Sequence, residues 1–173
     1  MRKVILFVNI TLDGFLCGPD GELDWMLPDP EMNIEFTDAM RARVDTILSG
    51  RVAHEQLQAN FRAQAADPAS PPALVDFARW MIDTPSVVFS RSGAGDLVAE
   101  VEALKALPGK DMVLFGGAGT AQEFARQGLV DEYWLKVYPV ALGAGRPLFT
   151  EHTSLTLKES KAWGSGIVTL RYE

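Results

Sequence analysis

The sequence predicts one α/β domain, residues 1–173, whose sheet is mainly parallel and gains an antiparallel hairpin at its carboxyl-terminal end. Three observations indicate this fold class. Short apolar, β-rich runs alternate with amphipathic segments through residue 137, as in strand–helix–strand units. The pattern changes at the proline and glycines of 139–145. Two β-rich runs then follow, joined by Gly164-Ser165-Gly166.

The first half of the chain is divided by the spacing of its apolar residues. In order we expect a strand at 3–10, a Gly/Pro/Asp-rich loop at 11–30, a helix, a strand at 46–48, a short helix from Arg51, a surface loop at 59–72, a helix and a strand at 86–89. Phe36, Met40 and Val44 are spaced i, i+4 and i+8, which predicts one helix face. The loop prediction rests on a stretch rich in Ala and Pro with few apolar anchors.

The second half contains clearer start and stop signals. In order we expect a helix capped by Asp96, a strand at 112–115, a helix through 127, a strand at 133–137 and a hairpin of 155–163 with 167–172. Thr120 and Glu123 have the spacing of a capping box at the start of the middle helix. Gly128 fits the end of that helix, with Phe124 placed to contact Leu129.

Composition excludes several classes of function. The net charge of −7 argues against non-specific binding of nucleic acid or anionic membranes. No apolar run reaches the length of a membrane span, and the amino terminus resembles no signal peptide, so we expect a cytoplasmic protein. Neither Cys-x-x-Cys nor His-x-Glu occurs, which excludes a zinc deaminase site, and we expect no metal. The single cysteine, Cys17, is expected to be inert.

The glycine-rich turn after the 112–115 strand is the most informative motif. Gly116, Gly117, Ala118, Gly119 and Thr120 lie between a predicted strand and a predicted helix. Glycines there let backbone N–H groups approach an anion, and a helix start favours negative charge. The sequence does not match the G-x-G-x-x-G dinucleotide fingerprint. The motif therefore indicates either a phosphate site of another fold or a tight structural turn.

Two further strand ends carry residues suited to anions. Ser49-Gly50-Arg51 follows the second strand, and Ser90-Arg91-Ser92 follows the third. Ligands of parallel sheets bind beyond the carboxyl ends of the strands, and guanidinium groups suit phosphate. Each motif alone is also common in turns. Together with the glycine turn, they predict a ligand with several phosphates along one sheet edge.

The chain resembles the reductase-type domain at the carboxyl end of bifunctional riboflavin-biosynthesis deaminase–reductases, and its free-standing relatives. The matching segments, in family order over nearly the whole chain apart from 59–72, are 12–15 (LDGF), 23–26 (LDWM), 47–55 (ILSGRVAHE), 88–92 (VFSRS), 115–117 (FGG), 129–132 (LVDE) and 139–149 (PVALGAGRPLF). The resemblance implies a three-layer fold like that of dihydrofolate reductase. It also implies that the chain forms a homodimer, for which the terminal hairpin offers an edge.

The resemblance implies NADPH as the cofactor. Gly50, Arg51 and Val52, together with Ser49 and the Ser90-Arg91-Ser92 motif, would hold the adenosine 2′-phosphate end. The residues from Gly116 to Thr120 would hold the pyrophosphate, and the backbone near Asn9 and Ile10 would flank the nicotinamide. The chemistry agrees, because a 2′-phosphate requires charged donors, whereas an NAD site would place a carboxylate on the ribose.

The substrate side is expected in the loop around Trp25, which would form a wall. Trp25-Met26-Leu27-Pro28 resembles a folate-reductase segment, but Pro30 occupies the position of the folate-binding acid, which argues against folate reduction. Asp13, Asp24 and Glu31 are candidates for a proton donor or a substrate anchor, or are ordinary solvated loop residues. A carboxyl group with a raised pKa could deliver the proton. Arg146 follows a second glycine loop that either binds an anion or bends the chain.

The predicted function is an NADPH-dependent reductase of a small pterin- or pyrimidine-like heterocycle. The alternative within enzymes is 5-amino-6-(5-phosphoribosylamino)uracil reductase of riboflavin biosynthesis. The alternative of another class is a non-catalytic NADPH-binding protein, which the displaced acid favours.

Overall fold

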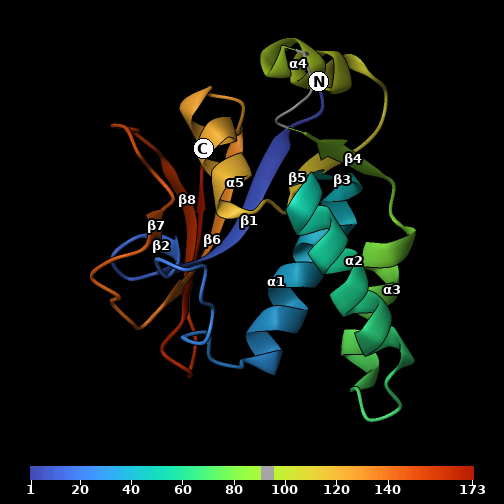
Figure 1. Cartoon of the computed structure of the whole chain (residues 1–173), viewed down its shortest axis with the longest axis vertical. Helices are drawn as coiled ribbons and strands as arrows, with labels where there is room; N and C mark the ends of the chain where they lie inside the picture. Colours follow the sequence, from blue (N-terminus) through green and yellow to red (C-terminus); the bar gives the residue numbers. More distant parts are fainter. Residues whose placement is uncertain (91–95) are drawn as a thin grey trace.

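The computed structural model describes residues 1–90 and 96–173. Within them, seven strands form one sheet in the order β4-β3-β5-β1-β6-β9-β8, and β2 pairs separately with β7 (Figure 1). The strands are β1 (Val4–Thr11), β2 (Phe15–Cys17), β3 (Val44–Gly50), β4 (Ser86–Phe89), β5 (Asp111–Leu114), β6 (Glu132–Tyr138), β7 (Arg146–Pro147), β8 (Leu157–Ala162) and β9 (Val168–Tyr172). The first five strands of the sheet order are parallel, and β9 and β8 are antiparallel, which confirms the predicted fold class.

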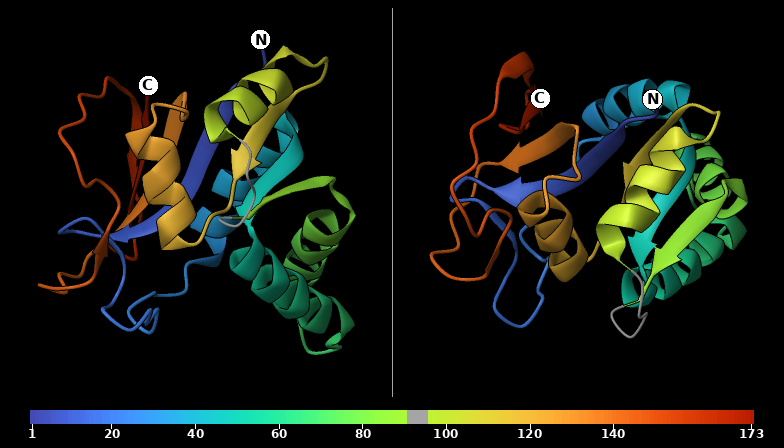
Figure 2. Two further views of the ribbon diagram at one scale, coloured as in Figure 1. Left: turned by 45° about the horizontal axis from the view of Figure 1, so that its top comes forward. Right: turned by 90° about the horizontal axis from the view of Figure 1, so that it is seen from above.

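Helices cover both faces of this sheet (Figure 2). They are α1 (Pro30–Arg43), α2 (Arg51–Ala66), α3 (Pro72–Asp83), α4 (Leu97–Ala106) and α5 (Ala118–Arg126). Alternate residues of β1 belong to two separate apolar clusters. Leu6 lies in the cluster that includes Phe124 of α5, and Phe7 lies in the cluster that includes Phe36 of α1. A central parallel strand buried on both faces explains why β1 reads as a continuous apolar run.

The predicted loop at 59–72 is wrong for most of its length. Helix α2 continues to Ala66 and α3 begins at Pro72, so only a short turn separates them. Ala, Gln and Arg are strong helix formers, and this stretch contains several of them. Phe61 also anchors the helix, because its ring packs edge-on against Phe77 of α3 with centroids 5.5 Å apart.

Two other boundaries differ from the prediction. Val44 does not extend the helix of Phe36 and Met40; it begins β3 and pairs with Asp111 of β5. The predicted 11–30 loop contains the short strand β2, whose partner β7 lies more than a hundred residues away in the sequence. Both differences arise from pairing with distant strands, which local spacing does not report.

The ends of α5 show one wrong and one confirmed prediction. Thr120 and Glu123 form no capping box, because the N-cap is Gly117 and Glu123 pairs instead with Arg126 at 2.6 Å. At the other end, the N–H of Leu129 donates to the carbonyl of Phe124 at 3.0 Å, and Gly128 has a φ of +66°. This is the glycine-terminated helix end that the sequence predicts. The Asp96 cap of α4 and the terminal hairpin are also confirmed.

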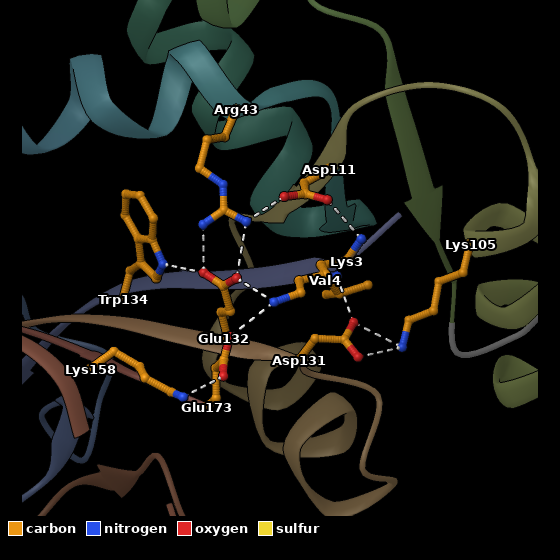
Figure 3. A network of polar contacts seen from close by, with 10 residues as sticks. All are labelled: Lys3, Val4, Arg43, Lys105, Asp111, Asp131, Glu132, Trp134, Lys158 and Glu173. Atoms are coloured by element: carbon orange, nitrogen blue, oxygen red, sulfur yellow. Dashed lines mark hydrogen bonds and ion pairs between the residues drawn. The ribbon is translucent and has the colours of Figure 1, made fainter. Parts of the chain in front are cut away.

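A network of charges lies where β1, β5 and β6 begin, at the edge opposite to their carboxyl ends (Figure 3). Glu132 is its centre: its carboxylate accepts hydrogen bonds from Arg43 at 2.8 Å, Lys3 at 2.9 Å and the indole of Trp134 at 3.0 Å. Asp131 beside it pairs with Lys105 at 2.9 Å. These contacts give both acids a structural role, because they join the starts of three strands.

Candidate functional site

The carboxyl ends of β3 and β5 lie side by side, and each strand leads directly into a helix. Leu48 of β3 is the register partner of Leu114 of β5. Helix α2 begins after Gly50 and α5 begins after Gly117, and neither N-cap supplies a side-chain hydrogen bond. The backbone N–H groups of a helix's first turn have no partner within the helix. Two helix starts that favour negative charge therefore meet at this edge of the sheet.

The two helix starts approach each other closely. A Cβ atom at Gly50 would lie 2.3 Å from the Thr120 hydroxyl oxygen of α5, and a Cβ at Gly117 would lie 3.6 Å from the Cβ of Ala53 in α2. Ala118 and Gly119 form the first turn of α5. The structure thus brings the Ser49-Gly50-Arg51 motif after β3 next to the glycine-rich turn after β5, as the sequence predicts.

The side chains around these glycines differ in exposure. Arg51 is the first residue of α2; its side chain is 62% exposed and contacts Glu55 at 3.2 Å. Val52 is also exposed, whereas Ser49 is fully buried, with its hydroxyl 3.5 Å from Nδ1 of His54. Ser49 is therefore placed to support the turn from inside.

The structure describes only part of the Ser90-Arg91-Ser92 motif, which follows β4. Phe89 of β4 is the register partner of Gly50, and the exposed Ser90 follows it, so this end also lies beside the helix starts. Arg91 and Ser92 fall outside the residues that the structure describes.

The predicted substrate side lies around the carboxyl ends of β1 and β6. The Trp25 ring is buried; its N–H donates to the carbonyl of Glu22 at 3.1 Å, and it packs nearly perpendicular to the Tyr138 ring with centroids 5.3 Å apart. Asp24 and Glu31 are both exposed. These contacts hold the Trp25 ring in place, and the two acids lie on the surface, close to it in the sequence.

Asn9 and Ile10 belong to opposite faces of β1. Ile10 joins the apolar cluster under α5. Nδ2 of Asn9 lies 3.2 Å from the sulfur of Met26, in the Trp25 loop. Of the two residues expected beside the nicotinamide, Asn9 is therefore the one whose side chain contacts the Trp25 loop.

Asp13 does not have the raised pKa that a carboxyl group would need in order to donate a proton. The Thr11 hydroxyl donates to this carboxylate at 2.6 Å, and the backbone N–H groups of Gly143 and Leu142 donate at 2.8 and 3.2 Å. The hydrogen bond from Thr11, followed by that from Gly143, lowers the pKa of Asp13. An ionised carboxylate held by three donors fastens the glycine loop to the end of β1 and is unsuited to donating a proton at neutral pH.

Arg146 lies just beyond this glycine loop, as the exposed first residue of β7. Its neighbour Pro147 accepts a hydrogen bond at 2.7 Å from Gln122 of α5. The β2–β7 pair therefore connects the Asp13 turn to the helix of the glycine-rich motif, and Arg146 lies on that connection.

Sequence reasoning missed two polar residues on the α1 face of the sheet. Asp29 is the buried N-cap of α1: it accepts from the N–H of Met32 at 2.9 Å and from the hydroxyl of Ser165. The Asp29-Pro30 pair was an available signal, because Asp at N-cap and Pro at N1 mark helix starts. Lys136 of β6 is the second, with 5% of its surface exposed. A lysine within the apolar run of the predicted 133–137 strand was an available signal of its burial.

Comparison with known sequences shows which family shares this arrangement. The family model described as the RibD C-terminal domain matches residues 2–169. The chain belongs to the RibD C-terminal domain family. Within the described residues no helix is long and apolar enough to cross a membrane, and no cluster of His, Cys, Asp and Glu suits a metal ion.

Relatives of this RibD-type domain include both free-standing and longer proteins. The Bacillus subtilis protein YyaP, described as uncharacterized, is 36% identical over 99% of this chain and 94% of its own length. The riboflavin biosynthesis protein RibD of Corynebacterium ammoniagenes is 31% identical over 88% of this chain and 47% of its own length. A solved structure from Shewanella, titled a putative riboflavin biosynthesis protein, has a TM-score of 0.68 at 24% identity, covering 99% of this chain and 98% of that one. The expected reductase-type fold is confirmed.

The contact between the two helix starts of this RibD-type domain leads to a first prediction. We expect Gly50→Ala to destabilise the fold by about 1–3 kcal/mol, because the added methyl group overlaps the Thr120 hydroxyl. Adding Thr120→Ala should restore most of the loss, since it removes the overlapping atom. Urea unfolding of the two single variants and the double variant measures this coupling. Additive effects in the double variant would show that the two helix starts do not touch.

Proposed function

We propose that this chain is an NADPH-dependent reductase of a small heterocyclic substrate. The observation that carries the proposal is the pair of adjacent helix starts at Gly50 and Gly117, neither of them capped by a side chain. Such a pair supplies several backbone N–H donors to a pyrophosphate. Family membership supports the same conclusion, because RibD-type domains occur in riboflavin-biosynthesis proteins.

The residues present fit a phosphorylated dinucleotide. Gly116, Gly117, Ala118, Gly119 and Thr120 would receive the pyrophosphate. Arg51, with Ser90 and Arg91, would receive the 2′-phosphate. The surface pair of Arg51 with Glu55 contributes little energy, because both side chains are largely hydrated, so the guanidinium is available for a phosphate.

When bound, NADPH supplies the hydride for such a reaction. The chain's own part is to position the reactants: Trp25 forms a fixed wall, and the Asn9 amide lies beside the sulfur of Met26. Asp13 fixes the loop that presents Arg146, which we propose as an anchor for an anionic group of the substrate. Asp24 and Glu31 remain the candidates for delivering a proton, because both are exposed near Trp25 in the chain.

Two finer assignments follow from the relatives. The similarity to a riboflavin biosynthesis protein favours a uracil bearing a phosphoribosyl group as the substrate, with Arg146 near its phosphate. We also propose a homodimer, since β8 is an edge strand whose six residues are all exposed.

The experiment that tests the proposal is calorimetric titration with NADPH and with NADH. We expect the wild-type protein to bind NADPH at least tenfold more tightly than NADH, roughly the value of one charged hydrogen bond to the 2′-phosphate. Arg51→Ala should weaken NADPH binding by about tenfold and leave NADH binding unchanged.

Arg62→Ala is the matched control, because Arg62 lies on the same helix and contacts only Gln58 in the described part of the chain. Equal losses for both cofactors in Arg51→Ala would refute the 2′-phosphate site. Binding of neither cofactor by the wild-type protein would refute the reductase. Tight NADPH binding without turnover of pterins or pyrimidines would favour the non-catalytic alternative.

A further inference from the structure

Lys136 is a buried cation in the middle of the sheet. It lies on β6 with 5% of its surface exposed, and its Nζ donates to the side-chain oxygen of Asn33 on α1 at 2.9 Å. Nζ also lies 4.7 Å from the centre of the Phe7 ring. Within residues 1–90 and 96–173, no carboxylate forms an ion pair with it. Burial lowers the pKa of Lys136 to about 8.

A buried lysine without an ion-pair partner is costly, because the charge loses its hydration. A Met or Leu would fill the same apolar position without this cost. The ammonium has three N–H donors, and in the described part of the chain the side chain of Asn33 accepts one of them. The Phe7 ring stabilises the charge but is a poor substitute for an oxygen acceptor. The ammonium of Lys136 can therefore still donate hydrogen bonds to a ligand.

The surroundings place Lys136 on the substrate side of the proposed active site. Its register partner across the parallel pair is Asn9, so both side chains point to the α1 face. Tyr138, two residues further along β6, also lies on this face and packs against Trp25. Lys136 and Asn9 thus lie on the same face as Trp25 and Tyr138, two residues before Tyr138 along the strand direction.

The side-chain amide of Asn9 is a second hydrogen-bond donor without a strong acceptor in the described residues. Its amide nitrogen points at the sulfur of Met26, 3.2 Å away, and a thioether is a weak acceptor. An oxygen atom of a ligand would replace that contact at little cost. The ammonium of Lys136 on β6 and the amide of Asn9 on β1 therefore lie next to each other as hydrogen-bond donors. The loop above them carries Met26, whose side chain is only half buried.

We propose that Lys136 is a specificity-determining residue: its ammonium group donates a hydrogen bond to a carbonyl oxygen of a heterocyclic substrate, beside the Asn9 amide. This inference rests on the proposed function for the location of the substrate. The chemical class it selects is a ring with a lactam carbonyl, as in uracils and 4-oxopterins. A ring that carries an amino group in place of the carbonyl would set a donor against the donors of Lys136 and Asn9, so the site would reject it.

The test is calorimetric binding of three probes in the presence of saturating NADP⁺: 5,6-diaminouracil, neopterin, and 4,5,6-triaminopyrimidine, which lacks a carbonyl group. We expect one of the two oxo probes to bind the wild-type protein and the triamine not to bind. Lys136→Met, which keeps the shape of the stem, should weaken the oxo probe by about tenfold or more. The tighter of the two oxo probes identifies a pyrimidine or a pterin as the substrate.

A pH series separates recognition from a structural role. Affinity of the wild-type protein should fall as pH rises through about 8, because the ammonium loses its proton there, whereas Lys136→Met should show no such fall. Other titratable groups on this face change outside that window: the pKa values of Asp29 and Glu132 are lowered and that of Tyr138 is raised. Other charged groups on this face, among the described residues, include the guanidinium groups of Arg43 and Arg171 and the Lys161–Glu35 pair.

Lys161→Met is the matched control, because Lys161 lies on the exposed strand β8 and pairs with Glu35 of α1. It should leave probe binding unchanged. Equal affinity of wild type and Lys136→Met, or failure of both oxo probes to bind, would overturn the inference. Oxo-probe binding that depends on Lys136, in a protein that does not bind NADPH, would uphold this recognition and refute only the reductase.

Discussion

Replacing Glu132 with glutamine is expected to lower the free energy of unfolding by about 3 kcal/mol near pH 7. The side chain is 10% exposed and accepts from Arg43, Lys3 and Trp134. Glutamine keeps the size but offers one oxygen and an NH₂ group, so at least one of these donors loses its acceptor. Arg43 and Lys3 are partly exposed and regain water, which keeps the loss at the lower end for buried pairs.

The pH dependence provides an independent check. Burial raises the pKa of Glu132, but the hydrogen bonds from Arg43, Trp134 and Lys3 outweigh it and hold the value at about 2, below the ordinary 4.5. The stabilisation is therefore complete above pH 4.5 and is lost as pH falls toward 2. The stability difference between wild type and Glu132→Gln should shrink across this window in urea unfolding.

Asp38→Asn is the control for Glu132→Gln, because Asp38 is 60% exposed and pairs with Arg41 on the surface of α1. We expect a change below about 0.5 kcal/mol at any pH. An equal loss in both variants, or a Glu132 effect that does not vary between pH 4.5 and 2, would show that the network does not act through the ionised carboxylate.

Gly145→Ala is expected to destabilise the β2–β7 pair by about 2–4 kcal/mol. The φ of Gly145 is +154°, and an added Cβ would lie 2.3 Å from the carbonyl oxygen of Cys17. Backbone cannot move aside as a side chain can, so the strands must separate. Arg146 moves with them, and binding of a phosphorylated substrate should weaken together with stability.

Hydrogen exchange of the amides in 15–17 and 142–148 measures this opening directly. Gly164→Ala is the matched control, because nothing lies within 4 Å of its added Cβ and its φ is outside the left-handed region. Unchanged protection in Gly145→Ala would contradict the close contact between the loop and β2.

The parts of the fold that follow local rules were predictable from sequence. The end of α5 at Gly128 and the Asp96 cap of α4 depend on residues within one helical turn. The extension of α2 depends on Phe61 meeting Phe77 across two helices, and β2 exists only because β7 returns to pair with it. Neither relation can be recognised from spacing along the chain.

The candidate site divides in the same way. The glycines at 50, 116, 117 and 119 were recognisable as motifs from sequence, and an added Cβ at Gly50 or Gly116 would crowd a neighbouring atom. The role of Asp13 was not, because its carboxylate is defined by the N–H groups of 142–143, which lie far away in the sequence. Lys136 is an intermediate case. Its burial could have been inferred from its place in an apolar strand, but the hydrogen bond to Asn33 could not have been inferred from sequence.

The central position of β1 has a consequence for how the protein is made. Val4 and Ile5 pair with Met112 and Glu132, so during synthesis β1 must wait for partner residues that lie more than a hundred positions later. At roughly 5–20 residues per second, this delay is on the order of ten seconds. During it, a strongly apolar β-forming segment has no partner, and contacts this distant in sequence also slow folding itself. We therefore expect refolding to be slow and its yield to fall with protein concentration.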